Sequence, residues 1–223
     1  MFFPEKISLI GPKDRVLEIG PGASPHFRSD AFLELNFDTP LDKIAQRGGG
    51  QKDANFGNRP IHLYDGKEFP FKDNEFDYVI CSHVIEHVDN PDFFLKELFR
   101  VGGGRGYIEY PLITYEYLYN FDVHTLFVKY DSQFDTLNFL PKVDTNISEF
   151  LMVSNLLRNS LQLGWDDLVR VNKSFFFEGI EFEEPFLIRR VSNIGFLLPD
   201  SSLLKRKSFP RRLASYFFER LGL

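Results

Sequence analysis

Residues 15–25 read RVLEIGPGASP, a short apolar run that ends in a turn rich in glycine and proline. An apolar run of this length, closed by such a turn, predicts a buried β-strand. A second run of the same kind, FDYVIC at residues 76–81, is closed by Ser82 and His83. These two runs predict two buried strands and give the framework for the rest of the chain.

Further strand-like and helical segments lie around these two runs. DAFLELN at residues 30–36 and PIHLYD at residues 60–65 each carry an acidic residue near the end. NPDFFLKELFRV at residues 90–101 has apolar residues at helical spacing, and YIEYP at residues 107–111 indicates another strand. Repeated short strands with such crossovers predict an α/β fold with a Rossmann-like, mainly parallel sheet, which binds ligands at the carboxyl ends of its strands.

The second half of the chain has a less regular pattern. Residues 112–163 are rich in tyrosine and phenylalanine and predict a lid or substrate-binding insertion. Residues 173–191 indicate two strands around an acidic turn, which predicts an antiparallel hairpin at the sheet edge. Residues 203–223 form a basic C-terminal tail, and we expect one domain over residues 1–223.

Composition limits the classes of function. The formal net charge of -6 argues against a protein that coats nucleic acid, so we expect no nucleic-acid partner. Cys81 is the single cysteine, which excludes internal disulfides and a cysteine zinc cage and fits a reducing compartment. The sequence shows no signal-peptide pattern and no apolar run of membrane-spanning length, so we expect a cytoplasmic protein that is at most peripheral to a membrane.

The turn after the first predicted strand has the chemistry of a nucleoside-cofactor site. Gly20 and Gly22 permit a tight turn and let a ligand approach the backbone. A carboxylate at the end of the neighbouring strand can accept hydrogen bonds from ribose hydroxyls, and Glu34 fits this position. A strand followed by two such glycines is also a common structural turn, so the interpretation depends on the combination.

A longer stretch resembles one family. DGKEFPFKDNEFDYV at residues 65–79, which continues as ICSHVIEHVDNPDFFLKELFRVGGG, resembles the class I S-adenosylmethionine-dependent methyltransferases. In their small bacterial group the hallmark is D-x-x-x-L-P-F-x-D-x-x-F-D-x-V, and here Phe69 stands in place of leucine. The resemblance covers about residues 16–111. Two departures are Ser24, where the family commonly has a third glycine, and residues 25–31, which leave no room for the usual helix.

The resemblance implies S-adenosylmethionine as the cofactor and residues in four strand-end turns as its binding site. These residues are Glu18, Gly20, Pro21, Gly22, Glu34, Asp65, Gly66, Cys81, Ser82 and His83. In the resemblance the first four surround the methionine moiety, the fifth holds the ribose, the next two contact adenine and the last three close around the sulfonium. The implied reaction is methyl transfer to an oxygen or nitrogen atom of a small-molecule, glycan or lipid acceptor.

The segment HVIEHV also contains H-x-x-E-H, which is a zinc-metallopeptidase signature. Such a site needs both imidazoles on one face of a helix, whereas His83 directly follows a predicted strand, so we expect no metal. His83 and His124, the latter in the predicted lid, are the candidate general bases. Glu86 and His87 are expected to brace a helical turn.

Several alternatives remain open at the level of sequence. The chain is an active methyltransferase, a cofactor-binding homologue or interaction module without activity, a nucleotide-sugar or dinucleotide enzyme, or a zinc hydrolase. The basic tail either packs on its own domain or makes a peripheral contact with an anionic membrane or a protein partner.

Overall fold

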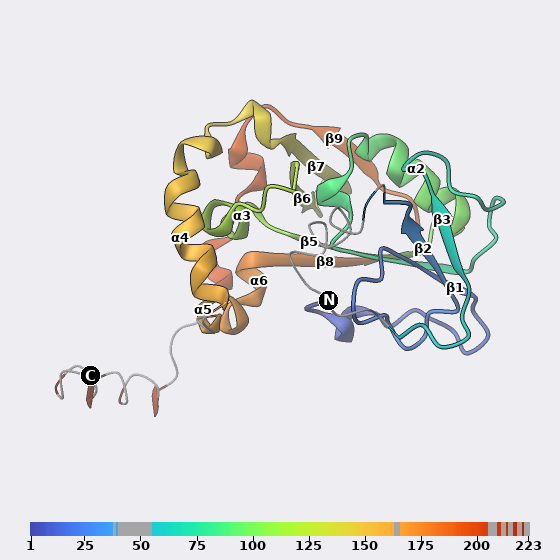
Figure 1. The fold of residues 1–223 in the computed structure, drawn as a ribbon, viewed down its shortest axis with the longest axis horizontal. Coiled ribbons are helices and arrows are strands. Elements are labelled where there is room, and N and C mark those ends of the chain that lie inside the picture. Colours follow the sequence, from blue (N-terminus) through green and yellow to red (C-terminus); the bar gives the residue numbers. More distant parts are fainter. Residues whose placement is uncertain are drawn as a thin grey trace.

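The computed structural model describes most of the chain in an α/β arrangement with two sheets (Figure 1). The described residues are 1–37, 39, 55–162, 166–204, 209, 210, 213, 216, 217 and 220. Most of the basic tail at residues 203–223 lies outside them, so its membrane or protein contact stays a prediction. Within the described part of the chain, no helix has the length and apolar character needed to cross a bilayer.

The larger sheet has six strands in the order β3-β2-β1-β4-β5-β8. Their bounds are β1 Val16–Ile19, β2 Ala31–Leu35, β3 Ile61–Tyr64, β4 Tyr78–Ser82, β5 Gly106–Pro111 and β8 Phe177–Phe182. The first five strands pair in parallel, and β8 runs antiparallel to β5. All four residues of β1 are buried, as expected for a central strand covered on both faces. The predicted Rossmann-like, mainly parallel sheet is confirmed.

Helix α2 (Pro91–Val101) connects β4 to β5 and lies over one face of the sheet (Figure 1). The Asn90 side chain caps the helix by accepting the Phe93 N–H at 3.1 Å, and proline at the first helical position suits the fixed backbone there. By contrast, residues 20–30 between β1 and β2 contain turns and no helix. The short connection seen in the sequence therefore replaces a crossover helix with a turn.

A second, three-stranded sheet has the order β6-β7-β9, with bounds β6 Leu126–Asp131, β7 Thr136–Pro141 and β9 Leu187–Arg190. The other α-helices gather on the side of the molecule opposite β2 and β3 (Figure 1): α3 Ile113–Tyr119, α4 Leu151–Gln162, α5 Asp167–Val171 and α6 Lys173–Phe176. The short 3₁₀ helices are η1 Pro4–Lys6, η2 Ile85–His87, η3 Lys142–Asp144, η4 Ile147–Phe150, η5 Ile194–Leu197 and η6 Ser201–Leu203.

The prediction of a hairpin over residues 173–191 is wrong: both strands exist, but they do not pair with each other. β8 lies antiparallel at the edge of the large sheet as expected, but its partner is β5, whereas β9 pairs with β7 in the second sheet. The cause lies in the turn between them. Pro185 packs against Gly104 at the end of α2, and Phe186 is buried against Phe99 and Phe182, so the chain continues into the second sheet and does not fold back.

One apolar core joins the two sheets and α2. Leu17, Val79 and Ile108 of the large sheet share it with Leu98 of α2 and Leu137 of β7, and each of these side chains is fully buried. The second sheet therefore packs against the large sheet and α2 through shared buried side chains. The predicted lid at residues 112–163 contains α3, β6, β7 and α4, and its role in substrate binding stays a prediction.

Candidate functional site

A cavity of about 630 Å³ opens at the carboxyl ends of the parallel strands, which is where the sequence predicted a ligand site. Most of the predicted site residues line it: Glu18, Gly20, Pro21, Gly22, Glu34, Gly66, Ser82, His83 and His124. The turns after four different strands therefore meet at one cavity. Sequence reasoning missed Met1 and Phe2, which also line it.

Asp65 and Cys81, two other predicted site residues, do not line the cavity. The Asp65 side chain is exposed and pairs with Lys67, with 3.6 Å between carboxylate and ammonium. Cys81 points into the apolar core, and its burial raises the pKa of the thiol well above the usual value. Alternation along β4 explains this placement, because successive side chains of a strand point to opposite faces.

The glycine turn is built for close approach. Gly20 and Gly22 both have φ of +58°, a left-handed conformation that favours glycine. A Cβ atom on Gly20 would lie 2.6 Å from the Val84 side chain, so this glycine is required by packing. A Cβ atom on Gly22 would meet no atom within 4 Å, although Gly22 lines the cavity. Gly22 therefore presents its backbone, without a side chain, to a ligand in the cavity.

Two buried carboxyl groups flank that turn. Glu18 Oε2 accepts hydrogen bonds from the His26 N–H at 2.8 Å and the Ser29 hydroxyl at 2.6 Å, which braces the turn that replaces the crossover helix. Burial raises the pKa of the Glu18 carboxyl, against the effect of these hydrogen bonds. Glu34 sits on the neighbouring strand β2 and is 9% exposed at the cavity wall.

His83 lies at the centre of the cavity wall, directly after β4. It has φ of +57°, and its Nε2 is 3.0 Å from Glu109 Oε1 while its Nδ1 is 3.4 Å from Glu86 Oε1. Burial by itself would lower the pKa of His83, but the hydrogen bond with Glu109 and the nearby charge of Glu86 outweigh it and raise the pKa to about 9. At neutral pH His83 is therefore an imidazolium held between two carboxylates.

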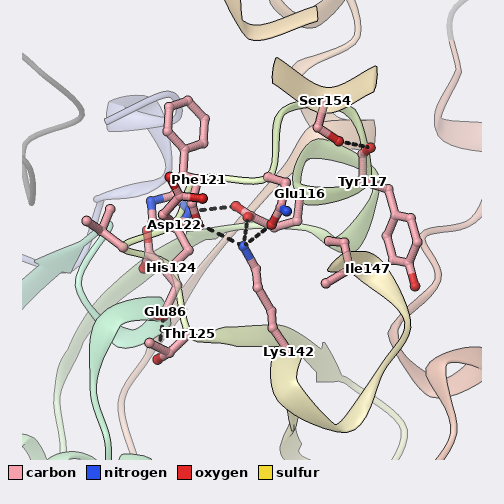
Figure 2. Close-up of polar contacts among 12 residues, drawn as sticks. Glu86, Glu116, Tyr117, Phe121, Asp122, His124, Thr125, Lys142, Ile147 and Ser154 are labelled. Carbon is pink, nitrogen blue, oxygen red and sulfur yellow. Dashed lines mark hydrogen bonds and ion pairs between the residues drawn. The ribbon is translucent and has the colours of Figure 1, made fainter. Parts of the chain in front are cut away.

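His124 belongs to a buried polar network that sequence reasoning did not find (Figure 2). Its Nδ1 lies 2.5 Å from Glu116 Oε1, and Lys142 pairs with the other carboxylate oxygen of Glu116. The Lys142 ammonium also donates to Asn120 Oδ1 at 3.2 Å and to the Phe121 carbonyl at 3.1 Å. These partners come from α3, the following loop and the start of η3, so no local spacing in the sequence could indicate them.

A second imidazole stands beside His124. The His87 and His124 ring centroids are 4.6 Å apart with the rings perpendicular, and both side chains line the cavity. His87 Nδ1 lies 2.9 Å from the Val123 carbonyl oxygen, and burial lowers the pKa of His87. The sequence expectation gave His87 only a bracing role, although the H-x-x-E-H spacing had already singled it out.

Aromatic rings complete this end of the cavity. Phe2, Tyr115, Phe121 and Phe177 line it, and the Tyr115 ring packs on Phe121 and Phe177 with centroids 5.7 and 4.6 Å apart.

The H-x-x-E-H residues do not share one helix face, because His83 with its positive φ lies outside η2. The peptidase geometry that this motif specifies is therefore absent from this described segment.

Comparison with known proteins matches a segment, less than half of the chain, that contributes most of the residues lining this cavity. The family model described as "Methyltransferase domain" matches residues 17–109. An uncharacterized protein of Methanocaldococcus jannaschii is 32% identical over 92 residues, which cover 40% of this chain and 40% of that protein. The chain thus matches less than half the length of this curated relative.

Solved structures give more distant similarities. An S-adenosylmethionine-dependent methyltransferase of Thermotoga maritima, described as a possible histamine N-methyltransferase, is 21% identical, covers 49% of each chain and has a TM-score of 0.33. A methyltransferase of Methanosarcina mazei is 18% identical over 56% of this chain and 69% of its own, with a TM-score of 0.32. At these scores neither structure contributes to the argument.

The family match confirms the resemblance found in the sequence. Residues 17–109 match the model of a methyltransferase domain, and the cofactor that this match implies is S-adenosylmethionine. The residues fit this cofactor, because the bare backbone at Gly22 and the carboxylate of Glu34 both line the cavity. Its volume of about 630 Å³ is in the range of small-molecule sites.

Proposed function

We propose that this chain transfers a methyl group from S-adenosylmethionine to an oxygen or nitrogen atom of a small-molecule, glycan or lipid acceptor. The observation that carries the proposal is one cavity that is lined both by a glycine turn with carboxyl groups and by imidazoles with aromatic rings; we assign the first group to the cofactor end and the second to the acceptor end. The methyltransferase-domain match supports the reaction class. The nature of the acceptor is our inference from an apolar, partly basic cavity end.

The turns after β1, β2 and β3 form the cofactor end in this proposal. Gly22 offers backbone amide and open space to the methionine moiety, with Glu18, Gly20 and Pro21 beside it, and Glu34 accepts from the ribose hydroxyls.

The adenine contacts are assigned to Gly66 and Asp65. Gly66 lines the cavity, and the ion pair that holds Asp65 on Lys67 is exposed. An exposed pair contributes little free energy, so the Asp65 carboxylate can turn to a ligand at low cost.

The other end of the cavity would receive the acceptor. S-adenosylmethionine, when bound, supplies an electrophilic methyl group. Phe2, Tyr115 and Phe177 exclude water and hold the acceptor in line with that group, an alignment that accounts for much of the acceleration in such transfers. The predicted lid at residues 112–163 contributes Tyr115 and His124, which supports its assignment to acceptor binding.

The two predicted catalytic histidines take different roles in this proposal. His83 is protonated and both of its nitrogens face carboxylates, so we assign it to positioning together with Ser82 at the sulfonium end. His124 has its Nδ1 engaged by Glu116, which leaves Nε2 as the atom that can take a proton from the acceptor. His124 is therefore the candidate base.

Calorimetric titration with S-adenosylmethionine tests the cofactor end. We expect one binding site in the wild type and at least tenfold weaker binding in Glu34→Ala, because the ribose loses its partner. Glu68→Ala is the matched control, since Glu68 is an exposed glutamate away from the cavity lining. Equal affinities for both variants would remove Glu34 from the site.

Release of S-adenosylhomocysteine in the presence of an acceptor panel separates an enzyme from a homologue that only binds the cofactor. We expect product with at least one hydroxyl or amine acceptor and a fall in kcat for His124→Ala. An inactive homologue would bind the cofactor and give no product with any acceptor. Ser24, which stands where the family commonly has a third glycine, is the sequence feature that favours this alternative.

A further inference from the structure

Three metal-ligating side chains meet where η2 approaches the loop before β6. One donor atom each from Glu86, His87 and His124 lies within 4.8 Å of the others. Zinc bound at about 2.1 Å places tetrahedral ligand atoms about 3.4 Å apart. Small side-chain rotations therefore suffice to bring the three donors onto one ion.

Both imidazoles already present the nitrogen that a metal needs. The Val123 carbonyl can only accept, so His87 carries its proton on Nδ1 and leaves the Nε2 lone pair open. Glu116 holds Nδ1 of His124 in the same way and is itself fixed by Lys142 (Figure 2). Metal-binding histidines typically donate the second ring N–H to a carbonyl or a carboxylate in this manner.

The third donor is a buried carboxylate that has charge contacts but no side-chain hydrogen bond within the part of the chain that the structure describes. Glu86 is 0% exposed, and neither of its side-chain oxygens has a hydrogen-bond partner among the residues that the structure describes. Its nearest charge contacts are His83 Nδ1 at 3.4 Å and His87 Nε2 at 3.9 Å, beyond good hydrogen-bond geometry. Burying a carboxylate without hydrogen bonds costs free energy, which these longer charge contacts offset less than a directly bound cation would.

The backbone holds the two segments in register. The Thr125 N–H donates to the Glu86 carbonyl oxygen at 2.7 Å, which ties the loop that carries His124 to η2 (Figure 2). The two imidazoles lie on tied segments and each has its own supporting hydrogen bond, so both are oriented before an ion arrives.

We propose that Glu86, His87 and His124 bind a divalent first-row transition metal ion of the zinc class at the acceptor end of the cavity. Two imidazoles and one carboxylate suit such ions better than magnesium or calcium, which prefer oxygen ligands. His87 and His124 line the cavity, so a remaining coordination position faces it.

This site departs from our expectation that the chain has no metal, and also from the H-x-x-E-H pattern. His124 takes the place of His83, whose Nε2 is committed to Glu109. The proposed metal site does not require that the chain transfers methyl groups. In the metal-loaded protein the Nε2 of His124 is a ligand, and it can act as a base only in the metal-free protein.

Zinc titration of the full, tag-free chain after dialysis against a chelator tests this proposal. We expect one equivalent of Zn²⁺ by calorimetry, and Co²⁺ to give the visible absorption of a low-coordinate site. Glu86→Gln, His87→Ala and His124→Ala should each weaken binding at least tenfold, and millimolar Mg²⁺ should not compete. His62→Ala is the matched control, since His62 lies on β3 and does not line the cavity.

Two further variants distinguish residues that support the ligands from a neighbouring histidine that is not a ligand. Glu116→Gln should weaken Zn²⁺ binding without removing a ligand, by about 10- to 100-fold, whereas His83→Ala should leave the affinity within about threefold. Far-ultraviolet circular dichroism checks that each variant is folded. A folded wild type that does not bind Zn²⁺, or binding that survives both His87→Ala and His124→Ala, overturns the proposal.

Discussion

Gly22→Ala is the sharpest test of the cofactor end, and the chain supplies its own control. Gly22 and Gly57 have φ of +58° and +59°, and a Cβ atom on either would meet no atom within 4 Å. Placing alanine in the left-handed region costs about 1–2 kcal/mol at both positions. The two variants should therefore lose similar unfolding free energy, because neither added methyl group clashes with the protein.

The variants should differ in cofactor binding. Gly22 lines the cavity and Gly57 does not, so only Gly22→Ala puts a methyl group where the ligand approaches the backbone. We expect its Kd for S-adenosylmethionine to rise at least tenfold, which corresponds to about 1.4 kcal/mol. The Gly57→Ala value should stay within about threefold of wild type.

Thermal unfolding and calorimetric titration of both variants provide the measurement. Equal affinities for Gly22→Ala and wild type would refute the claim that the bare backbone at Gly22 faces the cofactor. Equal losses of affinity in both variants would show that backbone strain, and not the added methyl group, governs binding.

Two predictions concern α2. The hydrogen bond from Arg100 lowers the pKa of Glu97, so the pair stabilises the fold above the unfolded-state pKa of about 4.3 and loses this effect as pH falls through the lower folded-state value. Urea unfolding should therefore show Glu97→Gln to be less stable than wild type at pH 7, with the difference shrinking towards pH 2; a constant difference would contradict the assignment. Asn90→Ala removes the cap on the Phe93 N–H and should cost about 1 kcal/mol in the same assay, whereas a change below about 0.3 kcal/mol would show that the cap is dispensable.

The sequence predicted the parallel sheet well because each strand and its turn are local features. The apolar run 16–19 is followed at once by a glycine turn, and the apolar run 76–81 is closed by the polar residues Ser82 and His83. Both signals require only neighbouring residues, and so does the cap of α2. The same locality made the cofactor turn recognisable.

Pairing between distant segments was beyond these local signals. The residues after β8 look like a hairpin turn, but Phe186 gains burial in the shared core and directs the chain to β7. The position of His124 beside His87 depends in the same way on Lys142 and Glu116, which are far apart in the chain. The prediction that Cys81 lines the site is wrong, because side chains of β4 alternate between the two faces of the sheet and Cys81 points into the apolar core.

A crystal structure of the chain with S-adenosylhomocysteine tests the cofactor site most directly. We expect difference density in the cavity, with the ribose hydroxyls on Glu34, the adenine at Gly66 and the sulfur directed towards the imidazoles. Density for the ligand at any other place, or bound ligand that contacts neither Gly22 nor Glu34, would contradict this assignment of the site.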